Sequence, residues 1–351
     1  MAVNRRALLR TGFTVTAVGA LGAAVHPIAT GAVTPQGRAV VRPEMHGTDA
    51  WGARPPNGAI EVLDRKPTYI VVHHTAGGNS DDLSLEHAFQ ISRDIQDLHM
   101  DGNGWIDSGQ QLTNSRGGHV TEGRHRSLEI LDGGVQHVMG ANVGNHNSEI
   151  IGIENEGIYV DVDVTQPLWD SLVQLVAYIA QQYGIATTEI KGHRDFNATE
   201  CPGTVLYARL PELRDAVGAV LGQAPQPVAH ANWPLLKPGE SGAKVLAAQH
   251  LLRARGAKDV PADGVFGQRT FEAVAQLAKG NGVAYEPCYA SRVADESGFI
   301  GVTTWPLLIR SVRAGDSSED AEAARVLLAA KGERANADRV IDAPAWQRLL
   351  V

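Results

Sequence analysis

Cysteine is scarce in this sequence, whose 351 residues contain only Cys201 and Cys288. Two cysteines form at most one bridge, so a disulfide framework is excluded as the source of stability. Positive charge is not in excess either, because 31 Lys and Arg stand against 39 Asp and Glu, which gives a net charge of −8. General nucleic-acid binders carry the opposite sign, so we expect no nucleic-acid partner.

Long apolar runs are also missing, apart from one stretch near the N-terminus. Arg5 and Arg6 precede an apolar segment at residues 11–25, which is short for a bilayer span of about 20 residues. A charged segment before an apolar one is the order of a secretory signal, and the paired arginines resemble a twin-arginine signal. Residues 1–32 are therefore predicted to be an export signal, with a membrane anchor as the alternative. We expect the protein outside the cytoplasmic membrane, with no stable membrane insertion after signal removal.

Strand and helix patterns alternate through residues 46–221. The run of β-branched and aromatic residues from Thr68 to Val72 indicates a buried strand. Residues 165–184 have the apolar spacing of an amphipathic helix. Further elements are expected as strands at residues 118–124 and 149–157, and as helices at residues 204–222 and 81–100, the last capped by Asp81 or Asp82. The alternation predicts an α/β domain with a mixed central sheet flanked by helices.

A second region follows residues 222–231, whose Pro, Ala and Gly content is that of a linker. Residues 236–256 match residues 312–332 at an offset of 76. Such a repeat predicts small stacked helical units, although an alanine-rich chain could produce the match by coincidence. We therefore expect a small all-α C-terminal region, with one unit at residues 232–310 and a degenerate second half-unit at residues 311–351.

A turn-like stretch at residues 192–203 contains His193 and Cys201. Imidazole nitrogen and thiolate are both good zinc ligands. Cys201 is alternatively a nucleophile activated by a histidine, or a structural residue bridged to Cys288. Pro202 disfavours the nucleophile interpretation. A nucleophilic cysteine often becomes more acidic at a helix N-terminus, and nothing in the sequence places Cys201 at one.

A third ligand is available at the end of the predicted strand. Side chains alternate along a strand, so only one of His73 and His74 faces a given side. A histidine from this strand end, together with His193 and Cys201, gives three ligands. Three protein ligands and an open fourth position are typical of catalytic zinc rather than structural zinc. The residues alone leave the metal, nucleophile and structural interpretations open.

Five stretches resemble the zinc-dependent N-acetylmuramoyl-L-alanine amidases in order and spacing. This is the type-2 amidase family, which includes peptidoglycan recognition proteins. The stretches are WGARPP, VVHHTAGG, GHVTEGR, HNSEIIGIENEG and GHRDFNATECPG. The resemblance implies the type-2 amidase fold, a groove for peptidoglycan, and Zn²⁺ as cofactor with His73, His193 and Cys201 as ligands.

One position departs from this family. Many recognition-protein amidases carry a catalytic tyrosine where this chain has Gln110, and glutamine cannot take a proton from water. The stretch IGIENEG resembles instead the amidase branch that recycles cell-wall fragments, in which the glutamate after IGI is the acid/base. The resemblance therefore implies that Glu154 is the catalytic residue, while Glu156 has the same strand parity and stays open.

Other site residues follow from the same resemblance. Thr199 stands where the family carries Lys or Thr to stabilise the oxyanion. His137 and Asn147 occupy positions that line the groove in family members, and Gln110 is grouped with them as substrate-binding. His74 is expected to be packed and hydrogen-bonded rather than a ligand.

The C-terminal region resembles the three-helix peptidoglycan-binding module. The pattern D-G-x-F-G-x-x-T runs from Asp263 to Thr270, and Trp305 matches the end of the module. The insert at residues 282–297, which contains Cys288, departs from the usual short form.

Together these features predict a secreted zinc amidase of the cell wall, exported by the twin-arginine route. Its expected partner is peptidoglycan, in which it would cleave the bond between N-acetylmuramic acid and L-alanine. The alternative is a binding protein of the same fold without turnover, for which Gln110 is the best sign. A third possibility, a Cys–His endopeptidase, predicts alkylation of Cys201 and indifference to a chelator.

Overall fold

The computed structural model describes residues 39–227, 233–283 and 295–351. The predicted export signal and Cys288 lie outside these residues, so the structure tests neither. Two large hydrophobic cores are present, one with members from Met45 to Leu221 and the other with members from Leu236 to Leu350. Within the described ranges, no helix combines the length and apolar character that crossing a membrane requires.

The first core is built on a central sheet of short strands. Their bounds are β1 (Met45–His46), β3 (Tyr69–His74), β4 (Leu112–Asn114), β5 (Val120–Glu122), β7 (Ile150–Asn155) and β8 (Ile190–Gly192). They form one six-stranded sheet in the order β1-β5-β4-β7-β3-β8. Strands β4 and β5 run antiparallel, and the other neighbouring pairs run parallel. A separate antiparallel pair joins β2 (Val62–Leu63) and β6 (His137–Val138).

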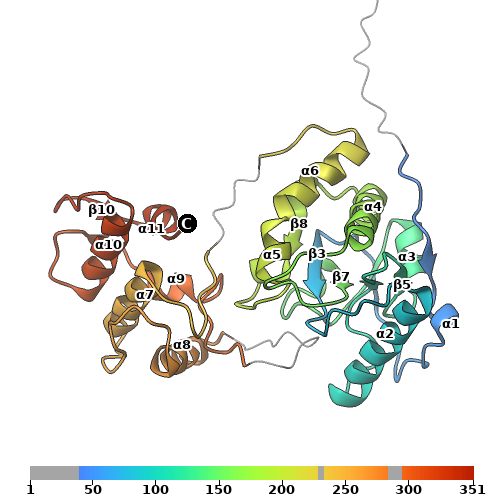
Figure 1. The fold of residues 1–351 in the computed structure, drawn as a ribbon, viewed down its shortest axis with the longest axis horizontal. Helices are drawn as coiled ribbons and strands as arrows, with labels where there is room; N and C mark the ends of the chain where they lie inside the picture. The colour runs from blue at the N-terminus through green and yellow to red at the C-terminus, as the bar shows by residue number, and fades with distance from the viewer. Residues whose placement is uncertain (1–38, 228–232, 284–294) are drawn as a thin grey trace, which may run out of the picture. The chain divides into compact units, whose positions relative to one another are not determined.

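Helices cover both faces of this sheet. Their bounds are α1 (Thr48–Trp51), α2 (Leu85–Asp97), α3 (Ser127–Gly133), α4 (Gln166–Tyr183), α5 (Thr204–Ala208) and α6 (Leu210–Leu221). Figure 1 shows α4 and α6 beside the central strands β3 and β7. Apolar residues of α4 and α6 share a core with Ile70 and Val72 of β3. The predicted mixed sheet flanked by helices is therefore confirmed.

The opposite face of the sheet carries α2 and the polar residues of the site. Ser92 of α2 hydrogen-bonds to Thr121 of β5 with an Oγ–Oγ1 distance of 2.7 Å. The helix begins later than the sequence predicts, because Ser84, and not Asp81 or Asp82, accepts the backbone N–H of His87. Asp82 instead accepts the backbone N–H of Ser84, which orders the turn before the helix.

The C-terminal region consists of helices and one short strand pair. Their bounds are α7 (Ala243–Ala254), α8 (Gln268–Gly280), α9 (Trp305–Leu308), β9 (Val312–Arg313), α10 (Glu319–Ala330), β10 (Val340–Ile341) and α11 (Ala343–Leu350). The antiparallel pair of β9 and β10 corrects the all-α expectation in this one detail. A single core spans the predicted boundary at residues 310 and 311.

The sequence repeat has a structural counterpart. Helices α7 and α10 begin and end at positions 76 residues apart. In each copy, an apolar residue that precedes the helix forms a β-bridge with an apolar residue that precedes a buried tryptophan. The indole N–H of that tryptophan donates to a backbone carbonyl. The residues are Leu236, Ile300, Trp305 and Pro234 in the first copy, and Val312, Ile341, Trp346 and Arg310 in the second. The second copy lacks an equivalent of α8, since residues 331–339 form no helix.

Candidate metal centre

Two neighbouring parallel strands bring the predicted ligands together. His73 lies near the carboxyl end of β3, and His193 directly follows β8. Because β3 and β8 are parallel, their carboxyl ends meet at one edge of the sheet. Cys201 returns to the same place, where its backbone carbonyl accepts the N–H of Arg194 over 3.1 Å. The sheet topology therefore converges residues that are up to 128 positions apart.

The three side chains have the geometry of a metal site. One potential ligand atom from each of His73, His193 and Cys201 lies within 4.8 Å of the others. The Sγ atom of Cys201 is 3.5 Å from Nδ1 of His73. Tetrahedral zinc with bonds of about 2.1 Å to nitrogen and 2.3 Å to sulfur would separate such atoms by about 3.6 Å. The donor types and the distance between Sγ of Cys201 and Nδ1 of His73 therefore suit zinc.

The surroundings keep these ligands in the forms that a metal requires. Burial lowers the pKa of His73 well below its usual value, and His193 and His74 lower it further. The ring is therefore neutral and has a lone pair to offer. The Sγ atom of Cys201 accepts the backbone N–H of His74 over 3.4 Å, which favours the thiolate form of the sulfur.

His193 is oriented through its second ring nitrogen. Its Nε2 lies 3.1 Å from Oδ1 of Asn197. Its Nδ1 is buried and has no hydrogen-bond partner among the described residues. Metal-bound histidines usually donate the other ring N–H to an oxygen nearby, which fixes the tautomer. The geometry therefore presents Nδ1 of His193 to a metal.

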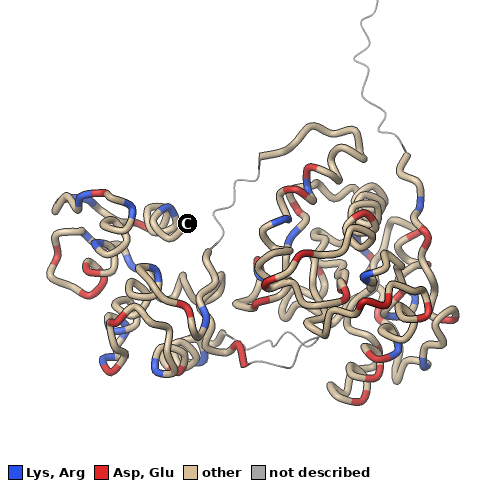
Figure 2. Tube along the Cα trace, viewed as in Figure 1, with Lys and Arg blue, Asp and Glu red and all other residues tan. Residues whose placement is uncertain are grey.

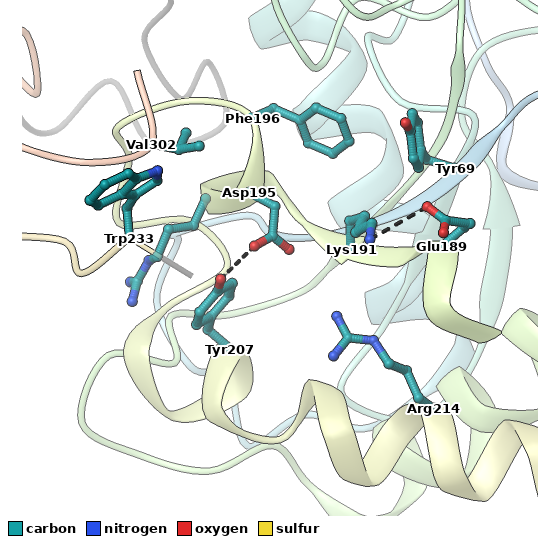
Figure 3. A pocket seen from close by; sticks show the side chains of 10 residues that line it. Tyr69, Glu189, Lys191, Asp195, Phe196, Tyr207, Arg214, Trp233 and Val302 are labelled. Atoms are coloured by element: carbon teal, nitrogen blue, oxygen red, sulfur yellow. Dashed lines mark hydrogen bonds and ion pairs between the residues drawn. The ribbon is translucent and has the colours of Figure 1, made fainter. Parts of the chain in front are cut away.

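Buried polar contacts hold the loop that carries His193 and Cys201. The guanidinium of Arg194 donates to the backbone carbonyls of Thr199 and Glu200 over 3.3 and 2.8 Å. Asp195 accepts the backbone N–H of Gly192 over 2.9 Å and the hydroxyl of Tyr207 over 2.5 Å. Figure 3 shows this contact between Asp195 and Tyr207 on the wall of a pocket that none of the three ligands lines. These hydrogen bonds therefore fix the conformation of the loop between His193 and Cys201.

Thr199 also helps to fix this loop. Its Oγ1 accepts the backbone N–H of Cys201 over 3.1 Å, and its side chain is fully buried. Accepting this bond uses one lone pair and leaves the hydroxyl proton to donate elsewhere. Thr199 therefore sets the position of Cys201 and retains one donor next to the site.

A polar row crosses the sheet beside the ligands. Register pairs His46 with Thr121, Thr121 with Thr113, Thr113 with Glu154, and Glu154 with His73. Paired residues of adjacent strands point to the same face of a sheet and have Cβ atoms about 5 Å apart. Glu154 is therefore the neighbour of the candidate ligand His73 in the sheet.

Glu156 has different partners. Its Oε1 lies 2.8 Å from Nε2 of His87, and its Oε2 accepts the backbone N–H of Arg116 over 2.9 Å. These bonds hold a fully buried carboxylate at the end of β7. The local sequence pattern left Glu154 and Glu156 open, and these contacts give Glu156 a structural role.

Gln110 joins the same polar row through Thr113, its middle member. Its Nε2 donates to Oγ1 of Thr113 over 2.9 Å, and its Oε1 is buried without a partner in the described chain. Thr113 is the register partner of Glu154. One side chain, that of Thr113, therefore links Gln110 to the position of Glu154.

The remaining predicted residues are held by the protein itself. The ring of His137 is 1% exposed and its Nδ1 lies 2.7 Å from the carbonyl of Arg65. Burial lowers the pKa of His137. The Oδ1 atom of Asn147 accepts the backbone N–H groups of Asn142 and Val143. Nε2 of His137 is buried without a hydrogen-bond partner among the described residues. Substrate contacts of His137 and Asn147 stay predictions.

His74 has the expected packed position. Its side chain points away from His73, is buried, and its Nδ1 accepts the backbone N–H of Tyr159 over 3.4 Å. Sequence reasoning missed Arg194 and Asn197, which orient the two loop ligands. The only sequence feature that could have indicated them is their place in the short loop between His193 and Cys201.

The first core region is similar to known proteins. The sequence model of a family described as N-acetylmuramoyl-L-alanine amidase matches residues 63–204. Peptidoglycan-recognition protein SC2 of Drosophila simulans is 32% identical over 158 residues, which are 45% of this chain and 79% of that protein. The N-acetylmuramoyl-L-alanine amidase of Homo sapiens is 27% identical over 167 residues, which are 47% of this chain and 27% of that protein. A solved structure of Drosophila PGRP-LB is 26% identical with a TM-score of 0.42, covering 48% of this chain and 92% of that one.

The fold and the donor set define an α/β protein with a candidate three-ligand metal site. The matched residues include the three candidate ligands and Glu154. The chain belongs to the type-2 N-acetylmuramoyl-L-alanine amidase family, whose members include amidases and peptidoglycan-recognition proteins.

Proposed function

We propose that this protein is a zinc amidase that hydrolyses the bond between N-acetylmuramic acid and L-alanine in peptidoglycan. The observation that carries the proposal is the convergence of two imidazoles and one thiolate beside a carboxylate. His73, His193 and Cys201 would hold the ion, and Glu154 pairs with His73 across adjacent strands. Names of relatives in the same family support the amide bond as the target.

The chain's own residues account for the proton transfers. Zinc supplies Lewis acidity, which polarises a carbonyl group and makes water more acidic. The carboxylate of Glu154 accepts the proton of the attacking water and returns it to the leaving amine nitrogen. The hydroxyl of Thr199 donates to the oxyanion that develops on the carbonyl oxygen. The amine product is a free L-alanine amino terminus.

Burial of the thiol argues against a cysteine nucleophile. The side chain of Cys201 is 0% exposed, and its Sγ already contacts the His74 backbone and the His73 ring. A nucleophile must reach the carbonyl carbon of a bound substrate, whereas a metal ligand need not. A disulfide with Cys288 is the remaining alternative, and it involves a residue outside the described ranges.

A binding protein without turnover is the second candidate function. Gln110 supports it, because an amide at the position of the family tyrosine cannot take a proton. Glu154, beside the candidate ligand His73, supports enzyme activity instead, because its carboxylate could take that proton. The two candidates differ in turnover and agree in wall binding.

The C-terminal region would hold the enzyme on insoluble wall. Gln249 ties together the D-G-x-F-G segment, because its Nε2 donates to Asp263 and its Oε1 accepts the N–H of Gly264. Figure 2 shows acidic and basic residues interspersed over the described chain, without a continuous basic stripe. This distribution suits a neutral glycan with short peptides better than a polyanion. Export by the twin-arginine route, through residues 1–32, completes the proposal.

The test is digestion of purified peptidoglycan by the full chain, with and without a chelator. An amidase releases new L-alanine amino termini, and it loses this activity with the chelator and regains it with zinc. Tight wall binding without new amino termini would establish the binding protein instead. Activity that survives the chelator and stops on thiol alkylation would establish the endopeptidase.

A further inference from the structure

Two buried polar atoms at the candidate metal site, one on His73 and one on Asn142, lack hydrogen bonds within the described part of the protein. The Nε2 atom of His73 and the Oδ1 atom of Asn142 are both buried, and neither meets the full geometry of a hydrogen bond with any described residue. Buried polar groups of this kind are rare in proteins and call for an explanation. One atom is a potential N–H donor and the other is an acceptor.

Asn142 lies on the site face of the sheet. A Cβ atom added to Gly152 would meet Oδ1 of Asn142 at 2.3 Å, so the amide lies directly over the glycine backbone. Gly152 pairs with Val71 on β3, two residues before the pair formed by Glu154 and His73. Residues two apart in a strand share a face. The amide of Asn142 is therefore next to His73 along the same face.

The orientation of this amide is fixed by its other half. Its Nδ2 donates to the carbonyl of Gly109 over 3.0 Å and to Oε1 of Gln111 over 3.3 Å. Neither of these acceptors could pair with the amide oxygen if the amide were reversed. Gln111 is itself fixed, since its Oε1 also accepts the N–H of Gly152 over 2.8 Å. The oxygen Oδ1 is thereby left to face the ring.

The ring of His73 is arranged to match. Its Nδ1 faces Cys201 and is the nitrogen that suits the metal, so Nε2 is the nitrogen left for a proton. The carboxamide oxygen of Asn142 is an acceptor on this face of the sheet, over the neighbouring Gly152. Metal-bound histidines typically have such an acceptor behind them.

We propose that Asn142 is the positioning residue of the metal site, whose Oδ1 accepts Nε2–H of His73 and so presents the Nδ1 lone pair to zinc. The proposal rests on the proposed zinc function. It also explains why residue 152 is a glycine, which leaves space for the Asn142 amide. Any side chain at Gly152 would displace the amide from the ring.

Two substitutions separate this role from a general role in the loop. Asn142→Leu removes the acceptor and the donor together. Asn142→Asp keeps an acceptor toward His73 but loses the donor to Gly109 and Gln111. Gln111→Leu is the matched control, because it loosens the same loop while the carbonyl of Gly109 still accepts from the Asn142 amide and orients Oδ1.

The measurements are zinc affinity of the full chain by chelator competition, and the tautomer of His73 by ¹⁵N NMR of the metal-free protein. Loss of an outer acceptor typically costs about 10–100-fold in metal affinity. We expect that loss in Asn142→Leu, with little change in Asn142→Asp and Gln111→Leu. The Nε2–H tautomer of His73 should dominate in wild type and in Asn142→Asp.

Two results would overturn the inference. One is wild-type zinc affinity in Asn142→Leu. The other is equal loss in all three variants, with an unchanged tautomer, which would make Asn142 a loop residue only. If the wild-type chain binds no zinc, the proposed function itself is wrong. The zinc affinity of the wild type alone distinguishes that outcome from a failure of the Asn142 proposal.

Discussion

Replacing Glu154 with Gln removes one function of the side chain and leaves the rest in place. Glutamine has the same length and keeps a hydrogen-bonding oxygen, but it cannot accept a proton at neutral pH. Glu154 sits within a parallel strand, paired on one side with His73 and on the other with Thr113. The strand therefore holds the new amide where the carboxylate was, and the ligand geometry is kept.

The expected loss follows from the role alone. General acid–base catalysis contributes about 10²–10⁴-fold to a rate, which corresponds to about 3–5 kcal/mol of transition-state stabilisation. Zinc content should not change, because Glu154 is not a ligand. Thermal stability should change little, because the variant replaces a buried side chain with one of the same shape.

The assay is the rate at which L-alanine amino termini appear during digestion of peptidoglycan, with zinc measured on the same samples. The matched control is Glu156→Gln, two residues further along the chain and just past the end of β7. Glu156 is bonded to His87 and to the Arg116 backbone, so its loss should lower Tm while leaving most of the rate. Wild-type turnover in Glu154→Gln, together with a large loss in Glu156→Gln, would refute the assignment.

The remaining predictions test the ligand, the tyrosine position, the layout and the helix pairing. Cys201→Ser should lower zinc occupancy and activity together, since a neutral hydroxyl is a far weaker zinc ligand than a thiolate; full metal by mass spectrometry would contradict this. Gln110→Tyr should bring little gain in rate and should not rescue Glu154→Gln, which kinetics of the double variant checks. A chain that ends at Gly222 should stay folded and cut soluble fragments, but sediment less with insoluble wall, because the first core ends at Leu221. The pKa of Glu319 is lowered from 4.5 chiefly by its hydrogen bond to His250, so its stabilising effect is present above pH 4.5 and lost below it; Glu319→Gln should lower Tm at neutral pH and make no difference in acid.

The sequence was sufficient for the parts of the fold that local pattern determines. β-branched residues of β3 and the helical period of α4 predicted those elements, because burial on a sheet and on a helix face have different spacings. The start of α2 was missed, since Asp82 and Ser84 are equally good caps by type. In the structure Ser84 is the N-cap and accepts the N–H of His87, while Asp82 accepts the N–H of Ser84 and orders the preceding turn.

The convergence of ligands was predictable only in part. Alternation at the strand end limited the choice to one of His73 and His74, but it could not choose between them. The structure places His73 on the face shared with Glu154 and leaves His74 bonded to Tyr159. Register between strands is a long-range property, which single-strand periodicity does not contain.

The outer contacts of the site could not be predicted at all. Asn142 is 69 positions from His73, and it reaches the ring only because Gly152 leaves room for it. Arg194 holds its loop through backbone carbonyls, which carry no sequence signature. Such contacts depend on loop paths between elements, and these are set by packing rather than by local pattern.

The most direct test of the central claim identifies the bond that is cut and the metal that is needed. Peptidoglycan is digested by the full chain as purified, after chelation, and after zinc is restored, and new amino termini are labelled and identified by mass spectrometry. We expect new L-alanine termini in the first and third samples and none in the second. New termini of another amino acid, or L-alanine termini that persist after complete removal of zinc, would contradict it.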